Sequence, residues 1–209
     1  SLVKKLAKVD GVARADGTVQ GIGLFVITKD NKLLGGSGAP TLTFNGSDAP
    51  NAAGEQIASL SSGRAPEGDH EVALDARSAE LAGYRLGDTV RMVTTEKNPN
   101  REATLVGIVE FGSGGLGGAT IVAFDTETAQ KIFFDGKNKF NIIGVTGQPG
   151  VSQKVLAKRV QAQLPQGFEA ITGKDLAAES QDLIDQVMGF LSTFLLVFAG
   201  VAIVVGSFL

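Results

Sequence analysis

The chain has 209 residues, of which 43% are hydrophobic and 20% are charged, and its formal net charge at pH 7 is −3. Such a length can bury a hydrophobic core, and the composition differs from that of disordered chains, which are polar and highly charged. The weak acidity argues against nucleic acid as a partner, and the absence of cysteine from the sequence excludes disulfides and thiolate metal sites.

The N-terminal segment predicts a helix followed by strands. Leu2, Leu6 and Val9 recur at helical spacing, and Gly11 can end a helix at this point. Residues 12–28 then contain strand-forming residues that are interrupted by glycines. We therefore expect the first part of the chain to fold as a short helix and an interrupted strand.

The middle of the chain, residues 39–137, is dominated by short strand patterns. Two helices interrupt them, at Ala76–Ala82 and at Thr126–Phe134, and Asp125 or Thr126 can cap the second helix. We therefore predict a β-rich inserted subdomain over these residues. The strand candidates, which are separated by Gly, Pro, Asn and Asp, are Thr41–Phe44, Glu71–Leu74, Thr89–Thr95, Arg101–Phe111 and Thr120–Phe124.

A strand, a helix and a second strand are predicted toward the C-terminal end, at Phe140–Thr146, Val151–Leu164 and Phe168–Thr172. This plan partly repeats that of the N-terminal segment. We therefore expect both ends of the chain to combine in one two-layer α+β unit, formed by residues 1–38 and 138–175, around the inserted subdomain.

A long helix is predicted to begin after Thr172, which with Asp175 has the spacing of a capping box. From Gln186 onward no residue is charged. Residues 189–209 would span about 31 Å as a helix at ~1.5 Å per residue, which matches the hydrocarbon core of a bilayer. We therefore predict a stalk and transmembrane helix over residues 176–209, and a buried core helix is the alternative.

The charges beside this helix indicate its orientation. No Lys or Arg follows Lys174, whereas acidic residues at 179, 182 and 185 precede the apolar stretch, so this side lacks the positive charge of a cytoplasmic flank. Residues 1 to about 185 should therefore be extracytoplasmic, with the α+β unit as the membrane-proximal subdomain. Small residues that would let another helix pack closely in the membrane are Gly189, Ser192, Ala199, Gly200 and Gly206.

A glycine-rich stretch follows the strand that ends at Phe111. Its first, third and sixth residues match the G-x-G-x-x-G pattern, but residues 119–124 continue as a strand, so no helix N-terminus follows to bind a pyrophosphate. We therefore expect no nucleotide site, and interpret the stretch as a hairpin tip or an extracellular contact loop. The residues of this candidate contact loop are Gly112, Ser113, Gly114, Gly115, Leu116, Gly117 and Gly118.

The single histidine, His70, lies between Asp69 and Glu71 in a loop before a strand. Zinc sites normally take several Cys or His ligands, and a serine triad needs a nucleophile elbow such as G-x-S-x-G, which the sequence lacks. A solvated loop residue is the simpler interpretation of His70. The sequence therefore predicts no catalytic residue, no metal site and no cofactor site.

Several short motifs occur along the chain in a characteristic order. They are Glu71–Ala76, Gly83, Leu86–Val90, Leu105–Ile108, Gly117–Ala119, Asp125, Ala129–Gln130, Phe133 and Pro149–Val151. In this order they resemble the extracytoplasmic region of FtsX-like permeases related to the MacB-type macrolide exporter. The apolar residues 195–208 resemble the second membrane helix of that family, and the similarity covers nearly the whole chain.

The resemblance implies the extracytoplasmic domain of an ABC transporter permease. In this family a subunit has one membrane helix before the outer domain and three after it, it dimerises, and it pairs with a cytoplasmic ATPase. The implied function is to couple ATP hydrolysis in that separate subunit to substrate export or mechanical signalling, with the ATPase, a second permease copy and the lipid bilayer as partners. The first membrane helix and the last two would lie outside this chain.

A second function remains open from the sequence. A membrane-tethered module could bind an extracellular ligand or partner without any ATPase. A secreted hydrolase with an anchor is disfavoured because the chain has a single histidine and no nucleophile motif.

Overall fold

The computed structural model of the chain describes residues 1–34, 40–46, 58–95, 99–111 and 118–179, together with Gln181, Asp185, Met188, Gly189, Ser192, Phe194 and Leu195. The chain divides into two compact units, Ser1–Val151 and Ser152–Leu209. Every strand in the described part of the chain belongs to the first unit.

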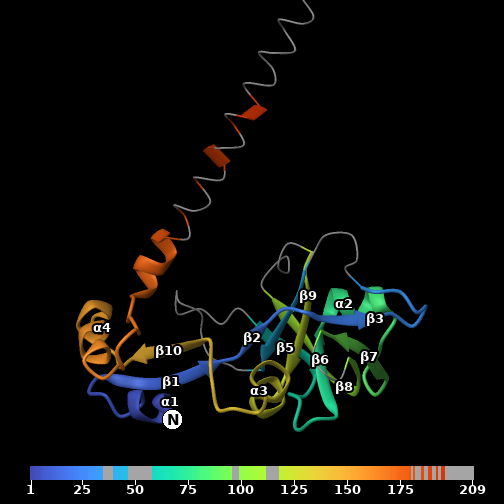
Figure 1. Cartoon of the computed structure of the whole chain (residues 1–209), viewed down its shortest axis with the longest axis horizontal. Helices are drawn as coiled ribbons and strands as arrows, with labels where there is room; N and C mark the ends of the chain where they lie inside the picture. The colour runs from blue at the N-terminus through green and yellow to red at the C-terminus, as the bar shows by residue number, and fades with distance from the viewer. Residues whose placement is uncertain are drawn as a thin grey trace, which may run out of the picture. The chain divides into compact units, whose positions relative to one another are not determined.

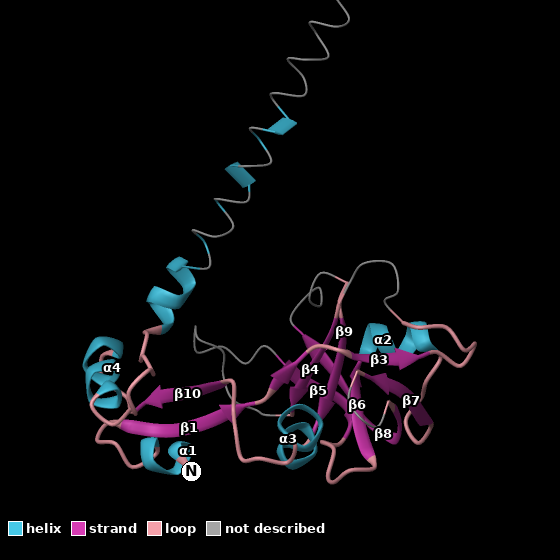
Figure 2. Cartoon of the chain, in the orientation of Figure 1, coloured by secondary structure: helices cyan, strands magenta, loops and turns pink. Residues whose placement is uncertain are grey.

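In the described part of the first unit, eight strands form a mixed, curled sheet (Figures 1 and 2). They are β2 (Gln20–Gly21), β3 (Leu24–Ile27), β4 (Thr41–Asn45), β5 (Ala58–Gly63), β6 (Glu71–Asp75), β7 (Thr89–Thr94), β8 (Asn100–Phe111) and β9 (Thr120–Phe124). Their order is β2-β4-β9-β6-β8-β7-β3, and β5 pairs with the C-terminal half of β8. The pairs β4–β9 and β6–β8 are parallel, and the other pairs are antiparallel.

The two end strands of this sheet are consecutive in the sequence. Only Ile22 and Gly23 separate β2 from β3. Gly23 has a φ of 96°, a conformation that favours glycine, and its carbonyl accepts a hydrogen bond from Thr95 N at 3.0 Å. The chain therefore turns a corner at Gly23, leaving one end of the sheet and joining the other.

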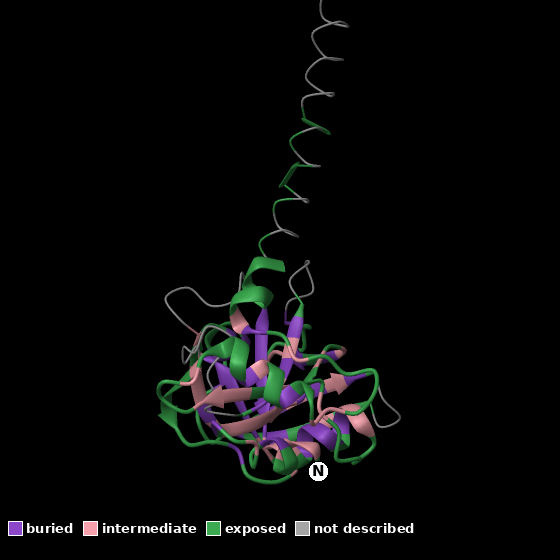
Figure 3. Cartoon of the chain, turned by 90° about the vertical axis from the view of Figure 1, so that its left-hand side faces the viewer, coloured by how far each residue is buried: buried purple, intermediate pink, exposed green. Residues whose placement is uncertain are grey.

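The strands bury one face in a common hydrophobic core. Alternate residues of β3 and β7 are buried, as the period of a strand requires, whereas β9, in the interior of the sheet, is buried along its whole length. Figure 3 shows these buried positions in purple. The largest fully buried apolar side chains belong to Phe124, Leu6, Leu24, Leu74, Met92, Leu105 and Ile121.

Two helices of the first unit lie where the sequence predicts them, α2 at Ala76–Ala82 and α3 at Thr126–Phe134. Each begins at an aspartate whose carboxylate accepts a backbone N–H from three residues later, at 2.9 Å for Asp75 and 2.6 Å for Asp125. α2 ends at Gly83, which is left-handed. These caps are local, which explains why the helix limits could be predicted.

A two-stranded antiparallel ribbon completes the first unit (Figure 1). It pairs β1 (Val12–Thr18) with β10 (Ile142–Gly147), so that the first residue of β1 faces the last residue of β10, and α1 (Leu2–Leu6) precedes β1. The α+β fold class is thus confirmed, with distant segments of the chain combined in one structure. β2 and β3, which also lie within residues 1–38, pair in the larger sheet, and the sequence-based domain limits stay a prediction.

The second unit contains α4 (Gln153–Gln161), which is shorter than the predicted helix. The strand predicted at Phe168–Thr172 is wrong. The side chain of Gln161 makes hydrogen bonds to two backbone groups of this segment, which in a strand would bond to a neighbouring strand. Its Nε2 donates to Phe168 O at 3.1 Å, and its Oε1 accepts from Ala170 N at 2.7 Å. Hydrogen bonds from a nearby side chain thus take the place of the backbone hydrogen bonds that a β-sheet would provide.

The helix predicted to follow Thr172 begins at residue 173, and residues 173–179 are helical. The hydroxyl of Thr172 accepts a hydrogen bond from Asp175 N at 3.1 Å and donates one to the Asp175 carboxylate at 2.7 Å. No helix within the described residues is both long enough and apolar enough to cross a bilayer. Most of the predicted transmembrane segment, residues 189–209, lies outside the described residues.

Gly107 of β8 lies where a side chain has no room. A Cβ at this position would come within 2.3 Å of Arg64 O, which is a backbone atom. We expect Gly107→Ala to lower the free energy of unfolding by ~1–3 kcal/mol, the usual effect of overpacking. Urea unfolding followed by circular dichroism measures this change.

Gly144→Ala in β10 is the matched control. The nearest atom to a Cβ there, Asp16 O, would be 3.9 Å away, so the methyl group has space. This variant should unfold at the same urea concentration as the original chain, or be more stable by up to ~1 kcal/mol. Equal midpoints for both variants would contradict the tight packing at Gly107.

Candidate functional site

The candidate functional site is the ribbon–sheet junction, where β1 and β10 meet the eight-stranded sheet. The backbone passes between ribbon and sheet at residues 18–20 and again at residues 135–141. The side chains and glycines that define the junction are Gly17, Gly21, Asn45, Gln130, Phe133, Phe140 and Asn141.

Asn45, the last residue of β4, joins three segments of the chain at the junction. Its Oδ1 accepts a hydrogen bond from Val19 N at 2.8 Å, and its Nδ2 donates to Gly17 O at 2.9 Å and to Thr126 Oγ1 at 3.0 Å. The residue is only 5% exposed. A buried amide with these bonds is costly to disturb, because removing it would leave its partners unpaired.

Two further side-chain amides hold the second crossing. The Oδ1 of Asn141 accepts a hydrogen bond from Gln20 N at 2.7 Å, and its backbone N donates to Thr18 O at 2.9 Å. The Nε2 of Gln130, on α3, donates to Lys139 O at 3.0 Å. The segment between α3 and β10 is therefore attached both to the helix before it and to the strand beside it.

Two phenylalanine rings lie against glycines at the junction. A Cβ built on Gly17 would lie 2.3 Å from Phe140 Cδ1, and one built on Gly21 would lie 2.3 Å from Phe133 Cε1. Each ring therefore occupies the space that a side chain would take, so a larger residue at either position would require the ring to move. The junction is packed as well as hydrogen-bonded.

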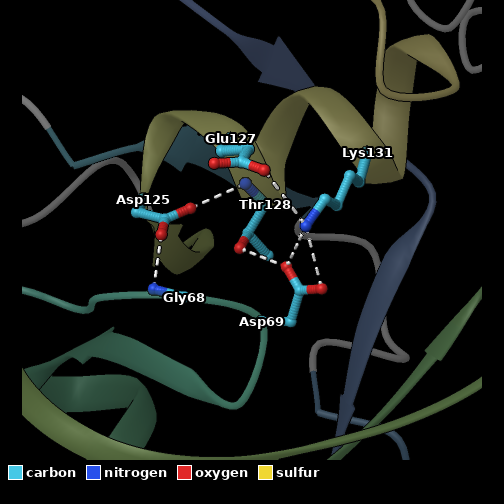
Figure 4. A network of polar contacts seen from close by, with 6 residues as sticks. All are labelled: Gly68, Asp69, Asp125, Glu127, Thr128 and Lys131. Carbon is cyan, nitrogen blue, oxygen red and sulfur yellow. Dashed lines mark hydrogen bonds and ion pairs between the residues drawn. The ribbon is translucent and has the colours of Figure 1, made fainter.

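A network of polar contacts attaches the loop before β6 to the start of α3 (Figure 4). Asp125 accepts hydrogen bonds from the backbone nitrogens of Gly68 and Thr128. Asp69 accepts one from Thr128 Oγ1 at 2.9 Å and pairs with Lys131 Nζ at 3.0 Å. Every carboxylate oxygen of Asp69 and Asp125 therefore has a partner, which is typical of a structural network.

The charges of this network shift the pKa values of its members. The hydrogen bonds from Lys131 and Thr128 lower the pKa of Asp69, and the Asp69 carboxylate raises the pKa of Lys131. Burial raises the pKa of Asp125, but the hydrogen bonds from Thr128 and Gly68 outweigh it, so the net change is a lowering. All three groups stay charged at neutral pH.

Arg64 fixes the other side of the same loop. Its guanidinium pairs with the carboxylate of Glu71, which also accepts a hydrogen bond from Glu67 N at 2.9 Å. The hydrogen bond from Arg64 is the main reason why the pKa of Glu71 falls to about 2. Because the Arg64 side chain is half exposed, this pair orients the loop more than it stabilises the fold.

The histidine singled out by the sequence belongs to no potential metal-binding group in the part of the chain that the structure describes. The side chain of His70 is exposed, and its backbone carbonyl accepts a hydrogen bond from Thr104 N at 2.8 Å. Among the residues that the structure describes, no group of three or more His, Cys, Asp or Glu side chains could hold a metal ion. His70 is thus a solvated loop residue.

The other sequence-predicted positions are only partly described. Residues 112–117 of the candidate contact loop lie outside the described residues, and Gly118 accepts a hydrogen bond from the guanidinium of Arg77 at 3.2 Å. Gly189 and Ser192 are helical. The remaining positions proposed for helix packing that lie outside the described residues are Ala199, Gly200 and Gly206. Both sets stay predictions.

Reasoning from the sequence missed the junction itself. The one local signal was the presence of Gly17 and Gly21 inside a strand-forming stretch, since glycine within a strand often marks a close approach of another group. The partners of Asn45 are 26, 28 and 81 residues away in the sequence, which no local pattern reveals.

Comparison with known proteins shows similarity in fold only. No family model and no curated protein matches the sequence. The periplasmic region of MacB from Actinobacillus actinomycetemcomitans superimposes with a TM-score of 0.55 at 15% identity, over 86% of this chain and 81% of that one. The extracellular domain of the ABC-type transporter YknZ from Gram-positive bacteria gives a TM-score of 0.53 at 13% identity. This match covers 81% of the present chain and 84% of the YknZ domain.

These similarities confirm, at the level of the fold, the resemblance that the sequence motifs indicated. The chain has the fold of the extracytoplasmic domains of MacB-like permeases. Both structures are matched over more than four-fifths of their length.

We predict that replacing the two asparagines of the junction has different effects on the free energy of unfolding. Asn45→Ala should lower the free energy of unfolding by ~1–3 kcal/mol, because it leaves buried polar groups without partners. Asn141→Ala is the matched control, since its side-chain bond to Gln20 N is exposed and water can replace it. Urea unfolding measures both, and an equal or larger effect at Asn141 would contradict the central position of Asn45.

The network predicts loss of stability in acid. Folding lowers the pKa values of Glu71 (to about 2), Asp69 and Asp125. The three carboxylates therefore contribute fully to the free energy of unfolding above the unfolded pKa of about 4, and this contribution is lost as the pH falls through the folded pKa values. We expect a constant melting temperature from pH 7 to about pH 5 and a decline toward pH 2.

Glu71→Gln should make this decline shallower, because the amide has no proton to gain. Asp30→Asn, which changes an exposed loop carboxylate, is the control and should leave the slope unchanged. Calorimetry across this pH range measures the slopes, and an identical slope for Glu71→Gln and the original chain would show that the Arg64 pair does not contribute.

Proposed function

We propose that the chain is the extracytoplasmic domain of an ABC transporter permease, in which it couples ATP hydrolysis by a separate cytoplasmic ATPase to substrate export or mechanical signalling. The observation that carries this proposal is the fold shared with the periplasmic region of MacB and with the extracellular domain of YknZ. The chain itself would not be an enzyme, and its partners would be the ATPase, a second permease copy and the bilayer.

The long helix supports the proposed attachment to a membrane. Met188 is 57% exposed, Phe194 52% and Leu195 65%, and no charged residue occurs from position 186 to the end of the sequence. Large apolar side chains on an exposed helix need another apolar phase, since each unburied side chain is unfavourable by roughly 1.5–3 kcal/mol. We propose that this phase is the cell membrane, with residues 1 to about 185 outside it.

The ribbon–sheet junction supports the proposed coupling. The hydrogen bonds of the buried Asn45 side chain and the ring contacts at Gly17 and Gly21 join the ribbon to the sheet. A displacement applied to the ribbon would therefore reach the sheet as a whole. We propose that residues 1–38 and 138–175 form the membrane-proximal part of this path and residues 39–137 the outer part.

The alternative is a membrane-tethered module that binds a ligand or partner without an ATPase. The candidate contact loop, residues 112–118, would then be the binding surface. The two functions differ in one measurable respect, because only the permease domain should change the rate of ATP hydrolysis by a partner subunit.

A proline in the long helix tests the coupling. Gln181 is helical, and Pro at this position removes a backbone hydrogen bond and destabilises a helix interior by ~3 kcal/mol or more. We expect Gln181→Pro, in the complete permease reconstituted with its ATPase, to lose most of the coupled activity and of the stimulated ATP hydrolysis. The outer domain should remain folded.

Gln181→Ala is the matched control. It removes the side-chain hydrogen bond from Gln181 Nε2 to Asp185 Oδ1, at 2.9 Å, but keeps the helix. This variant should retain coupling. If Gln181→Pro also retained full coupling, the long helix would not transmit motion. If the original chain did not change the rate of ATP hydrolysis at all, the binding-module alternative would gain support.

A further inference from the structure

We propose that Asn45 is a deamidation site that the folded ribbon–sheet junction protects and that opening of the junction exposes. Asn45 and Gly46 form the only Asn-Gly pair in the sequence. Glycine after asparagine favours this reaction, because the backbone nitrogen that attacks has no neighbouring side chain to hinder it. The proposal concerns the chemistry of this chain and does not depend on its assignment to a permease.

The reaction needs only water. The backbone nitrogen of Gly46 attacks Cγ of Asn45, a C–N bond forms, and the proton of that nitrogen passes to the side-chain amide, which leaves as ammonia. Water then opens the succinimide ring to give aspartate or isoaspartate. Isoaspartyl residues are substrates for protein carboxyl methyltransferases, the class of enzyme that would act on the product.

The junction blocks the attacking group. Gly46 N donates a hydrogen bond to Phe124 O at 2.6 Å, so its proton and its orientation are fixed by β9. Asn45 lies in the extended backbone of β4, paired with Phe124, and attack would require its backbone to leave this conformation. The reaction therefore requires the end of β4 to separate from β9.

The junction also holds the leaving group. Asn45 Nδ2 donates to Gly17 O and to Thr126 Oγ1, and its Oδ1 accepts from Val19 N. These bonds orient the side-chain amide toward β1, the connection between β1 and β2, and α3, and burial of the residue limits the approach of water. All of these constraints are released together when the junction opens.

The product would prevent the junction from closing again in the same way. A carboxylate in place of the amide cannot donate to Gly17 O, and two oxygens would then face each other in a buried site. Isoaspartate would also lengthen the backbone at the end of β4. Deamidation thus makes a transient opening permanent, and the fraction of modified chains records how often the junction has opened.

The test compares the folded chain with the same chain in urea, in a mildly alkaline buffer. Peptide mapping by mass spectrometry follows conversion of Asn45, and methyltransferase labelling identifies isoaspartate. We expect conversion in the folded chain to be at least about tenfold slower, which corresponds to an opening free energy of ~1.4 kcal/mol or more. Gly46→Ala should slow the reaction in urea, which would confirm the attacking nitrogen.

Two threonine variants on the same helix show whether the junction gives the protection. Thr126→Val removes a hydrogen bond made by Asn45, so conversion in the folded chain should be about two- to tenfold faster. Thr128→Val removes a bond to Asp69 instead and should leave the rate unchanged. Circular dichroism establishes that both variants are folded.

Two results would overturn the proposal. One is conversion of Asn45 at the same rate in the folded chain and in urea, because the fold would then give no protection. The other is the same rate for Thr126→Val and Thr128→Val in the folded state, because protection would then come from somewhere other than the junction. The comparison with urea requires no variant, so the proposal stays testable if a variant does not fold.

Discussion

The short connection between β2 and β3 is the constraint on which the first unit depends. These strands lie at opposite ends of a path with six strand-to-strand steps, which would separate them by ~29 Å in a flat sheet at ~4.8 Å per step. Gly21 and Leu24 are three residues apart, and an extended chain of that length spans at most ~11 Å. The sheet must therefore curl, and its core forms inside the curl.

The curl also determines where polar groups are buried. β4 is the neighbour of β2, so the end of β4 lies beside the point where β1 leads into the sheet, and Asn45 occupies that end. Its amide is buried with its hydrogen-bonding groups paired, and buried bonds of this kind resist opening. The exposed ion pairs of Asp69 and Glu71 are screened by water and contribute less. The junction is thus held together by an uncharged amide more than by the charges around it.

Sequence patterns predicted those features that local chemistry decides. The limits of α2 and α3 follow from their aspartate caps, and the start of the long helix follows from Thr172. β5 was missed because its sequence, Ala-Ser-Leu-Ser-Ser-Gly, has no β-branched residue and a single large apolar one, and in the described part of the chain it pairs with β8 alone. The candidate site was missed for the same reason, since Asn45 finds its partners through the fold.

The topology gives the ribbon a particular mechanical position. Val12 at the start of β1 faces Gly147 at the end of β10, so the segments from both ends of the chain enter the ribbon at the same end. At the other end both strands continue toward the sheet, and no described backbone reaches the sheet except through β1 or β10. A load applied to both segments would therefore act on the two strands in the same direction and reach the sheet through the junction. A rigid junction is consequently a requirement for any motion that this fold transmits.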